Sequence, residues 1–276
     1  MGSDKSATND KQTTVLVTGA SGQLGRTFQK HQDQYPEVEF MFCDAKTLDI
    51  TKKESVFKAF QKFQPDFCIN CAAYTRVEQA EKEPERAYLI NAEGAKNMAE
   101  VASEFNTVLI HISTDYVFDG KKRTPYTTAD ATNPINIYGK SKLQGEKYIQ
   151  GILKNYFIVR TSWLYSKEFG KNFYRTILEK AKTEKELYVV DNQTGCPTDA
   201  ENLAMYILDL IITSPPKEEL GEAYGIRHFS GQKVMTWYDF AVDILKENQI
   251  DHVKVVKDNS YKAIAKRPEY SVLEVL

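Results

Sequence analysis

Cysteine is scarce in this sequence, and neither sign of charge is in large excess. The 276 residues include only 4 cysteines, too few and too scattered for a fold held together by disulfides. Lys and Arg total 36 against 38 Asp and Glu, a formal net charge of -2. With no block of like charges, nothing indicates a nucleic-acid partner or a basic arm for a membrane surface. We therefore expect a small-molecule partner.

Long apolar runs are also missing. No segment approaches the roughly 20 consecutive apolar residues that a membrane-spanning helix needs. The first 14 residues, MGSDKSATNDKQTT, are polar, where a secretory signal would need an apolar core. We expect residues 1–14 to be a disordered tail, because they offer little apolar surface to offset the entropy of ordering. The protein is expected to be cytoplasmic.

Two of the cysteines, Cys68 and Cys71, form a C-I-N-C pattern that allows a redox or zinc-binding interpretation. Against it, the pair closes an apolar run, and no second pair completes four metal ligands. Small, weakly polar cysteine side chains are common in buried strands. We favour a structural role and keep the redox or metal role as the alternative.

Short apolar runs alternate with segments of helical period over the first half of the chain. This alternation predicts an α/β fold, a doubly wound parallel sheet with helices on both faces. The predicted strands cover residues 15–17, 38–43, 67–69 and 108–112, and the predicted helices cover 22–30, 53–63, 84–105 and 138–150.

The rest of the chain has a different composition, with more aromatic residues and more residues typical of loops. It predicts strands over 157–161, 187–190 and 224–229, helices over 171–182, 200–212 and 236–247, and a loop over 214–221. We expect a nucleotide-binding domain over 15–160 and a smaller α/β substrate lobe over 161–276. The two are expected to interleave near residues 191–198.

A glycine-rich turn, Thr18-Gly19-Ala20-Ser21-Gly22-Gln23-Leu24-Gly25, follows the first apolar run and opens a helix. Glycines there let backbone approach a pyrophosphate, and the free N–H groups and dipole of the helix meet its charge. The turn therefore predicts a Rossmann-type site for NADPH or NADH, with Gly19, Gly22, Gln23, Leu24 and Gly25 at the cofactor. A purely structural turn is the alternative.

Two acidic residues are candidates for the adenosine end of that cofactor. Asp44 ends the second predicted strand, where a carboxylate can accept hydrogen bonds from the ribose hydroxyls. That would favour NADH, although Arg26 and Lys46 are near enough in sequence to offset repulsion of a 2′-phosphate. Asp49 and Ile50 stand where we expect a third strand to end, and would suit the adenine. Asp44 as a turn cap and Asp49 as a helix N-cap are the alternatives.

Tyr138 and Lys142 lie four residues apart, on one face of a predicted helix. An ammonium beside a phenol lowers the tyrosine pKa, so that the phenol can exchange a proton with a carbonyl oxygen. Thr114 ends the preceding predicted strand with a hydroxyl, at the sheet edge where α/β sites assemble. We therefore predict a catalytic set of Thr114, Tyr138 and Lys142. The structural alternative is a buried aromatic beside a surface charge.

These motifs together resemble the extended short-chain dehydrogenase/reductase superfamily and, within it, the dTDP-4-dehydrorhamnose reductases. The supporting segments run through nearly the whole chain: SGQLG (21–25), NCAAYTRVEQAE (70–81), STDYVFDG (113–120), NPINIYGKSKLQGE (133–146), RTSWLY (160–165), QTGCPT (193–198), WYDFA (237–241) and KRPEYSVL (266–273).

The resemblance implies NAD(P)H-dependent reduction of a 4-keto group on a nucleotide-linked deoxysugar, for surface polysaccharide synthesis. It implies that Tyr138 is the general acid, Lys142 binds the nicotinamide ribose and Thr114 holds the carbonyl. The cofactor channel would include Ala73, Tyr74, Thr75 and Ile112. The nucleotide sugar would contact Thr114, Asp115, Tyr116, Trp163, Thr198 and Arg267. A homodimer is the family-level expectation.

One departure from the family pattern concerns metal. Some members place a carboxylate just past the glycine turn as part of a magnesium site, but Arg26 and Thr27 stand there in this chain. We therefore predict no metal. Two competing functions stay open: another nucleotide-sugar reductase or epimerase, and a non-catalytic NAD(P)-binding regulatory subunit.

Overall fold

The computed structural model describes residues 12–214, 224–260 and 262–275. Most of the predicted tail and of the predicted 214–221 loop lies outside this part. The tail prediction was wrong at Thr13 and Thr14, which begin the first strand, β1 (Thr13–Thr18). Both pair with β2, where Thr13 is opposite Val38 and Thr14 opposite Glu39.

A six-stranded sheet forms the centre of the molecule, in the order β10-β5-β4-β3-β1-β2. The strands are β2 (Val38–Cys43), β3 (Phe67–Asn70), β4 (Val108–Thr114), β5 (Tyr156–Thr161) and β10 (Gly225–His228), besides β1. All neighbours are parallel. The strand order reverses between β1 and β3, and α/β proteins bind ligands beside such a reversal, at the carboxyl ends of the strands. The predicted doubly wound parallel sheet is confirmed.

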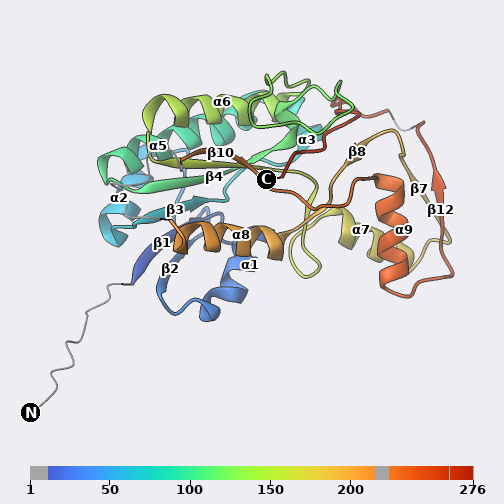
Figure 1. Ribbon diagram of the computed structural model, residues 1–276, viewed down its shortest axis with the longest axis horizontal. Helices are drawn as coiled ribbons and strands as arrows, with labels where there is room; N and C mark the ends of the chain where they lie inside the picture. The colour runs from blue at the N-terminus through green and yellow to red at the C-terminus, as the bar shows by residue number, and fades with distance from the viewer. Residues whose placement is uncertain (1–11, 215–223, 261, 276) are drawn as a thin grey trace, which may run out of the picture.

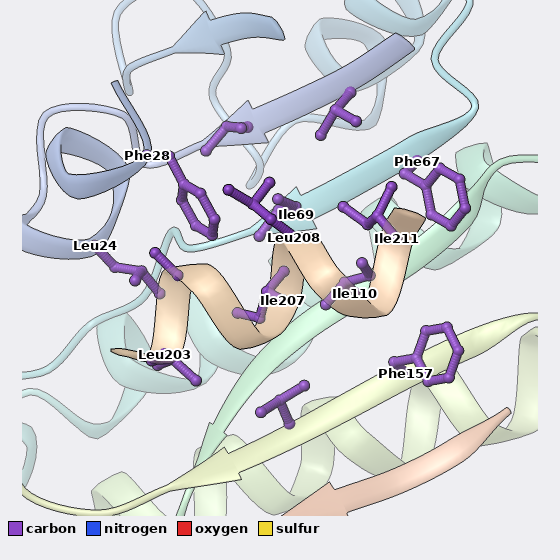
Figure 2. Packing of buried hydrophobic residues seen from close by; sticks show 14 of the residues in the cluster. Leu24, Phe28, Phe67, Ile69, Ile110, Phe157, Leu203, Ile207, Leu208 and Ile211 are labelled. Atoms are coloured by element: carbon purple, nitrogen blue, oxygen red, sulfur yellow. The ribbon is translucent and has the colours of Figure 1, made fainter. Parts of the chain in front are cut away.

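Helices cover both faces of the sheet (Figure 1). One face carries α2 (Lys53–Phe63), α5 (Gly94–Glu104) and α6 (Ile137–Ile152), and the other carries α1 (Gln23–His31) and α8 (Ala200–Ile212). Figure 2 shows α8 lying across the strands, with Phe28 of α1 and Ile207 of α8 directed into the same core. Each strand sends alternate residues to the two cores, so that Val15 and Val17 pack on one and Leu16 on the other.

The helix predicted over 84–105 is interrupted. It consists of α4 (Pro84–Tyr88), one π-helical turn (Leu89–Glu93) and α5, and is preceded by the short α3 (Val77–Ala80). A π turn inserts one extra residue and is frequent at functional sites. Periodicity alone does not reveal it, because the apolar stripe continues through the turn.

A smaller lobe forms a separate core from α7 (Phe173–Ala181), α9 (Trp237–Glu247), β7 (Glu186–Val189) and β12 (Lys254–Lys257). Strand β12 was missed, because its two valines stand between lysines. Two short strand pairs, β6 (Leu164–Tyr165) with β9 (Thr198–Asp199) and β8 (Thr194–Gly195) with β11 (Met235–Thr236), connect this lobe to the sheet. The chain returns to the main sheet in α8 and β10, after the lobe's first segments. Within the described residues, no helix is both long and apolar enough to cross a membrane.

Candidate active site

A pocket of about 530 Å³ opens at the carboxyl edge of the sheet, beside the reversal between β1 and β3. Its lining comes from both the sheet domain and the smaller lobe. It brings together fourteen residues predicted from the sequence, namely Gly19, Gly22, Gln23, Leu24, Gly25, Ala73, Thr75, Ile112, Thr114, Asp115, Tyr116, Tyr138, Lys142 and Trp163.

The glycine turn forms one wall of this pocket. Gly19 has φ +63, and a Cβ on it would lie 2.7 Å from the Ala72 backbone nitrogen. A Cβ on Gly25 would lie 2.6 Å from the Gly19 carbonyl oxygen. Helix α1 begins after Gly22 with no side-chain cap and no acidic residue in its first turn. Such a helix start presents unpaired N–H groups to an anion, so the residues present fit a dinucleotide pyrophosphate.

The segment Ala73-Tyr74-Thr75 is held by the π turn. Asn91, inside that turn, accepts from the Tyr74 backbone N–H at 2.7 Å and donates to the Tyr74 carbonyl at 3.0 Å. Its amide also donates to the Ser141 hydroxyl of α6 at 3.0 Å. The π turn therefore fixes the distance between the 73–75 wall and the helix that carries Tyr138.

Tyr138 and Lys142 both project from α6 into the pocket. Asn136 caps this helix by accepting from the Gly139 N–H at 2.8 Å. Burial raises the pKa of Tyr138 to about 12, while a hydrogen bond to Thr114 opposes the shift. The sequence-based prediction that Lys142 lowers this pKa was wrong for this structure, because burial dominates and no effect of Lys142 on it is resolved.

Lys142 is 1 % exposed. Its ammonium donates to the Ile112 carbonyl at 2.6 Å and lies 3.0 Å from His111 Nε2. Burial lowers the pKa of Lys142 to about 8, with the negative charge of Glu146 opposing. The amine is therefore near its titration range at neutral pH.

Thr114 ends β4 and is a hydrogen-bonding centre. Its hydroxyl donates to Asp115 Oδ1 at 2.9 Å and accepts from the Tyr116 N–H at 3.1 Å. Burial raises the pKa of Asp115 to about 7. The Tyr116 and Tyr138 rings meet edge to face, with centroids 5.9 Å apart. The arrangement places a hydroxyl, a carboxyl and two phenols at one side of the pocket.

Two indole rings also line the pocket. Trp163, with φ +47, stacks on Trp237 at the start of α9. A flat apolar face suits the C–H surfaces of a sugar ring. The pocket can thus hold an anionic dinucleotide at the glycine turn, with a carbonyl compound between the phenols and the indoles.

Comparison with known proteins identifies the family. The model of the RmlD substrate binding domain matches residues 13–275. The chain belongs to the RmlD family. Among its relatives is a dTDP-4-dehydrorhamnose reductase of Aggregatibacter actinomycetemcomitans, 39% identical over 270 residues, 95% of this chain and 90% of the relative. The spore coat polysaccharide biosynthesis protein SpsK of Bacillus subtilis is 40% identical over 262 residues, 95% of this chain and 89% of SpsK.

A solved structure of this RmlD family is similar in fold. It is a dTDP-4-dehydrorhamnose reductase from Bacillus anthracis in complex with NADP, 39% identical, with a TM-score of 0.89 over 96% of this chain and 91% of that one. The resemblance predicted from the motifs is confirmed.

Six predicted residues do not line the pocket. Asp44 Oδ1 accepts from the backbone N–H groups of Lys46 and Thr47 at 3.0 Å each, as in a turn cap, and its contact with the ribose stays a prediction. Asp49 and Ile50 stand in the loop before α2, not at the end of a strand, so that expectation was wrong. Asp49 is not the N-cap of α2 either, because Lys52 has that position. Ile50 is buried in the core beneath α5.

The other three lie near the pocket. Tyr74 is 7 % exposed, and its hydroxyl donates to Glu83 at 3.0 Å. Thr198 is fully buried, with its hydroxyl accepting from the Gly231 N–H at 3.2 Å. Arg267 forms an ion pair with Glu78 at 2.7 Å and lines a neighbouring pocket of about 510 Å³ that shares Trp237 with the first.

Eight pocket residues were not predicted: Cys71, Val77, Ser113, Thr161, Leu164, Gly170, Lys171 and Trp237. Several fall inside the sequence segments that carried the family resemblance. Those segments could have identified Trp237 and Thr161 as candidate site residues. Gly170 and Lys171 had none, since they approach α1 only through the fold, where a Cβ on Gly170 would lie 3.0 Å from Gln23 Cβ.

The two cysteines of the C-I-N-C pattern, Cys68 and Cys71, are buried and partly buried. The cysteines are free, and burial raises the pKa of Cys71 to about 12 and that of Cys68 as well. Protonated thiols are weak nucleophiles and metal ligands. Across the described ranges, no three or more His, Cys, Asp or Glu side chains gather as metal ligands.

Proposed function

We propose that this protein is a dTDP-4-dehydrorhamnose reductase, which reduces the C4 keto group of dTDP-4-dehydro-L-rhamnose with NADPH or NADH and yields dTDP-L-rhamnose. The observation that carries the proposal is the convergence of Thr114, Tyr138 and Lys142 in the pocket walled by the glycine turn. The activity of the relatives and the NADP complex of the similar structure support it. The similarity to SpsK supports a role in polysaccharide synthesis.

The reduced nicotinamide, when bound, supplies the hydride. The glycine turn and the start of α1 would hold the pyrophosphate, while Ala73, Thr75 and Ile112 would line the channel towards the nicotinamide. Lys142 would bind the nicotinamide ribose through an N–H group that Ile112 and His111 leave available.

Tyr138 acts as the general acid. With a pKa of about 12, its phenol is protonated at neutral pH and can donate to the oxygen that gains negative charge at C4. The Thr114 hydroxyl donates its one proton to Asp115 in this structure, and would turn that proton to the same oxygen when the substrate is bound. Asp115 and Tyr116 would contact sugar hydroxyls, the Trp163 face would carry the ring, and Arg267 would meet the diphosphate.

The wider setting follows from the same assignment. The protein would act in the cytoplasm as a homodimer, on a nucleotide sugar bound between a cofactor domain over 15–160 and a lobe over 161–276. Helix α8 (Ala200–Ile212) and strand β10 (Gly225–His228) pack with the strands of the cofactor domain, although they follow the first segments of the lobe in the sequence.

The test is loss of absorbance at the reduced nicotinamide band, with dTDP-4-dehydro-L-rhamnose as substrate. Tyr138→Phe should lower kcat by roughly 10²-fold or more, with cofactor affinity retained. Tyr148→Phe is the matched control, because Tyr148 lies on the same helix with its hydroxyl bonded to Glu93 at 3.2 Å. Cofactor binding without turnover of any nucleotide-linked ketosugar would instead favour a regulatory subunit.

A further inference from the structure

A row of polar side chains crosses the sheet behind Lys142. The Thr18 hydroxyl donates to Asn70 Oδ1 at 2.7 Å, Asn70 Nδ2 lies 3.1 Å from His111 Nδ1, and His111 Nε2 lies 3.0 Å from Lys142 Nζ. None of the four residues is more than 1 % exposed. They form one continuous hydrogen-bonded chain through the interior.

The strand register creates this chain. Thr18 of β1 is paired directly with Asn70 of β3, and Asn70 is paired with His111 of β4. Partners in register point to the same face of a sheet. Two residues earlier on each strand, Leu16, Cys68 and Leu109 occupy that face and pack in the core under α5 and α6. The polar row therefore lies next to this apolar row, on the face of the sheet that α6 covers. Lys142 reaches the polar row from α6.

Polar groups in such a position are costly unless they are fully hydrogen-bonded, and an apolar row would pack there without that cost. The row meets a specific need of Lys142, whose buried ammonium requires acceptors. Among the described residues Lys142 forms no ion pair; the Ile112 carbonyl and His111 supply its hydrogen bonds.

The other titratable groups near the Lys142 amine are bonded elsewhere or uncharged. His111 is therefore the neighbour that can either donate to the amine or accept from it. Glu146, on the same helix, is occupied by Arg160 of β5 at 2.7 Å and by Ser113. Cys71 follows β3 and is a protonated thiol, and Tyr138 is a protonated phenol. Asp115, titrating near pH 7, bonds to Thr114.

The row of Thr18, Asn70 and His111 can form a hydrogen bond with Lys142 in both of its charge states. With the Asn70 amide nitrogen towards Nδ1, the ring carries its proton on Nε2 and donates to a neutral amine. With the Asn70 amide reversed, Nδ1 donates to the Asn70 carbonyl, and Nε2 accepts from the ammonium. The Thr18 hydroxyl suits both arrangements, because a hydroxyl donates or accepts.

We propose that His111 is a positioning residue for Lys142, which with Asn70 and Thr18 behind it fixes the amine at the pocket and sets the pH range in which the amine is charged. The effect of this charge on the reaction rests on the proposed function. The titration of Lys142 can be measured without turnover.

The experiment is a ¹³C NMR titration of lysine-labelled protein, with the Lys142 signal assigned by its loss in Lys142→Met. His111→Phe keeps the ring and removes both nitrogens, and should lower the Lys142 midpoint by about one pH unit, since the ammonium loses an acceptor. His111→Gln restores an acceptor and should return the midpoint towards that of the wild type. The matched control is His228→Phe, another buried histidine, on β10 and bonded to the Tyr126 carbonyl at 3.0 Å.

A second variant keeps the test decisive where His111→Phe does not fold. Asn70→Asp places a carboxylate behind His111 and should raise the midpoint. An unchanged midpoint in a folded His111→Phe, or in Asn70→Asp, would overturn the proposal. The pH profile of kcat should move in parallel, and a midpoint shift without it would refute the link to the reaction. A wild type that turns over no ketosugar would refute the proposed function and leave the NMR result to decide the role of His111.

Discussion

The indole rings of Trp163 and Trp237 stack face to face, with centroids 3.5 Å apart and planes within 6°. Trp163 has a left-handed backbone, and a Cβ on Gly195 would lie 2.6 Å from its ring. Trp237 is the first residue of α9, inside the capping box of Thr236 and Asp239, and donates from its indole N–H to Gln193 at 3.2 Å. The pair is therefore held from several sides, and it lines the pocket that also contains Tyr138.

The first prediction concerns this pair. Trp237→Leu should raise KM for the nucleotide sugar up to about tenfold, because Trp163 loses a stacking interaction of about 0.5–1.5 kcal/mol that holds its ring in place at the pocket. Cofactor affinity should not change. Steady-state kinetics and a fluorescence titration with NADPH measure the two, and Trp237→Phe, which keeps an aromatic face, is the milder control. An unchanged KM in Trp237→Leu would remove the pair from the substrate site.

The second prediction concerns the glycine turn. Gly25→Ala should weaken NADPH binding at least tenfold, because the new Cβ would come within 2.6 Å of the Gly19 carbonyl and push α1 off the turn. Gly151→Ala is the control, since a Cβ there meets nothing within 4 Å, and alanine favours a helix. Equal dissociation constants for the two variants would contradict the proposed binding of the pyrophosphate at the glycine turn.

The third prediction concerns the buried ion pair of Glu146 and Arg160, whose side chains are 0% and 3% exposed. Glu146→Gln should lower the free energy of unfolding by about 3 kcal/mol or more, because it leaves the guanidinium charge uncompensated in the interior. Urea denaturation measures this. Glu179→Gln breaks an exposed pair with Lys182 and should change stability by less than about 0.5 kcal/mol; a similar loss in both variants would count against the argument.

The fourth prediction is a pH dependence of stability. Burial lowers the pKa of His228 to about 4, against about 6.5 in an unfolded chain. Below pH 6.5 the unfolded state binds a proton that the native state does not, so the stability present above that pH is lost as pH falls towards 4. At pH 5 the loss from this residue is about 2 kcal/mol. His228→Phe should therefore lose less stability than the wild type between pH 7 and pH 5, as measured by urea denaturation, and equal losses would refute the assignment.

Local signals in the sequence determined much of the fold and the site. Helices α2 and α8 and strand β2 have the predicted bounds, because apolar period and turn residues are local properties. The glycine turn and the Tyr138–Lys142 spacing are also local signals, and they predicted residues that line one pocket. The order of motifs along the chain was enough to predict the family.

Tertiary structure decided what depends on distant segments. The π turn that fixes the 73–75 wall, the pairing of Trp163 with Trp237, and the row from Thr18 through Asn70 and His111 all follow from strand register and helix docking. The pKa of Tyr138 is raised and not lowered, because burial is a property of the whole fold and outweighs the opposing hydrogen bond with Thr114. Sequence spacing fixes which residues can share a helix face. Packing fixes which groups are buried away from water and which groups they form hydrogen bonds with.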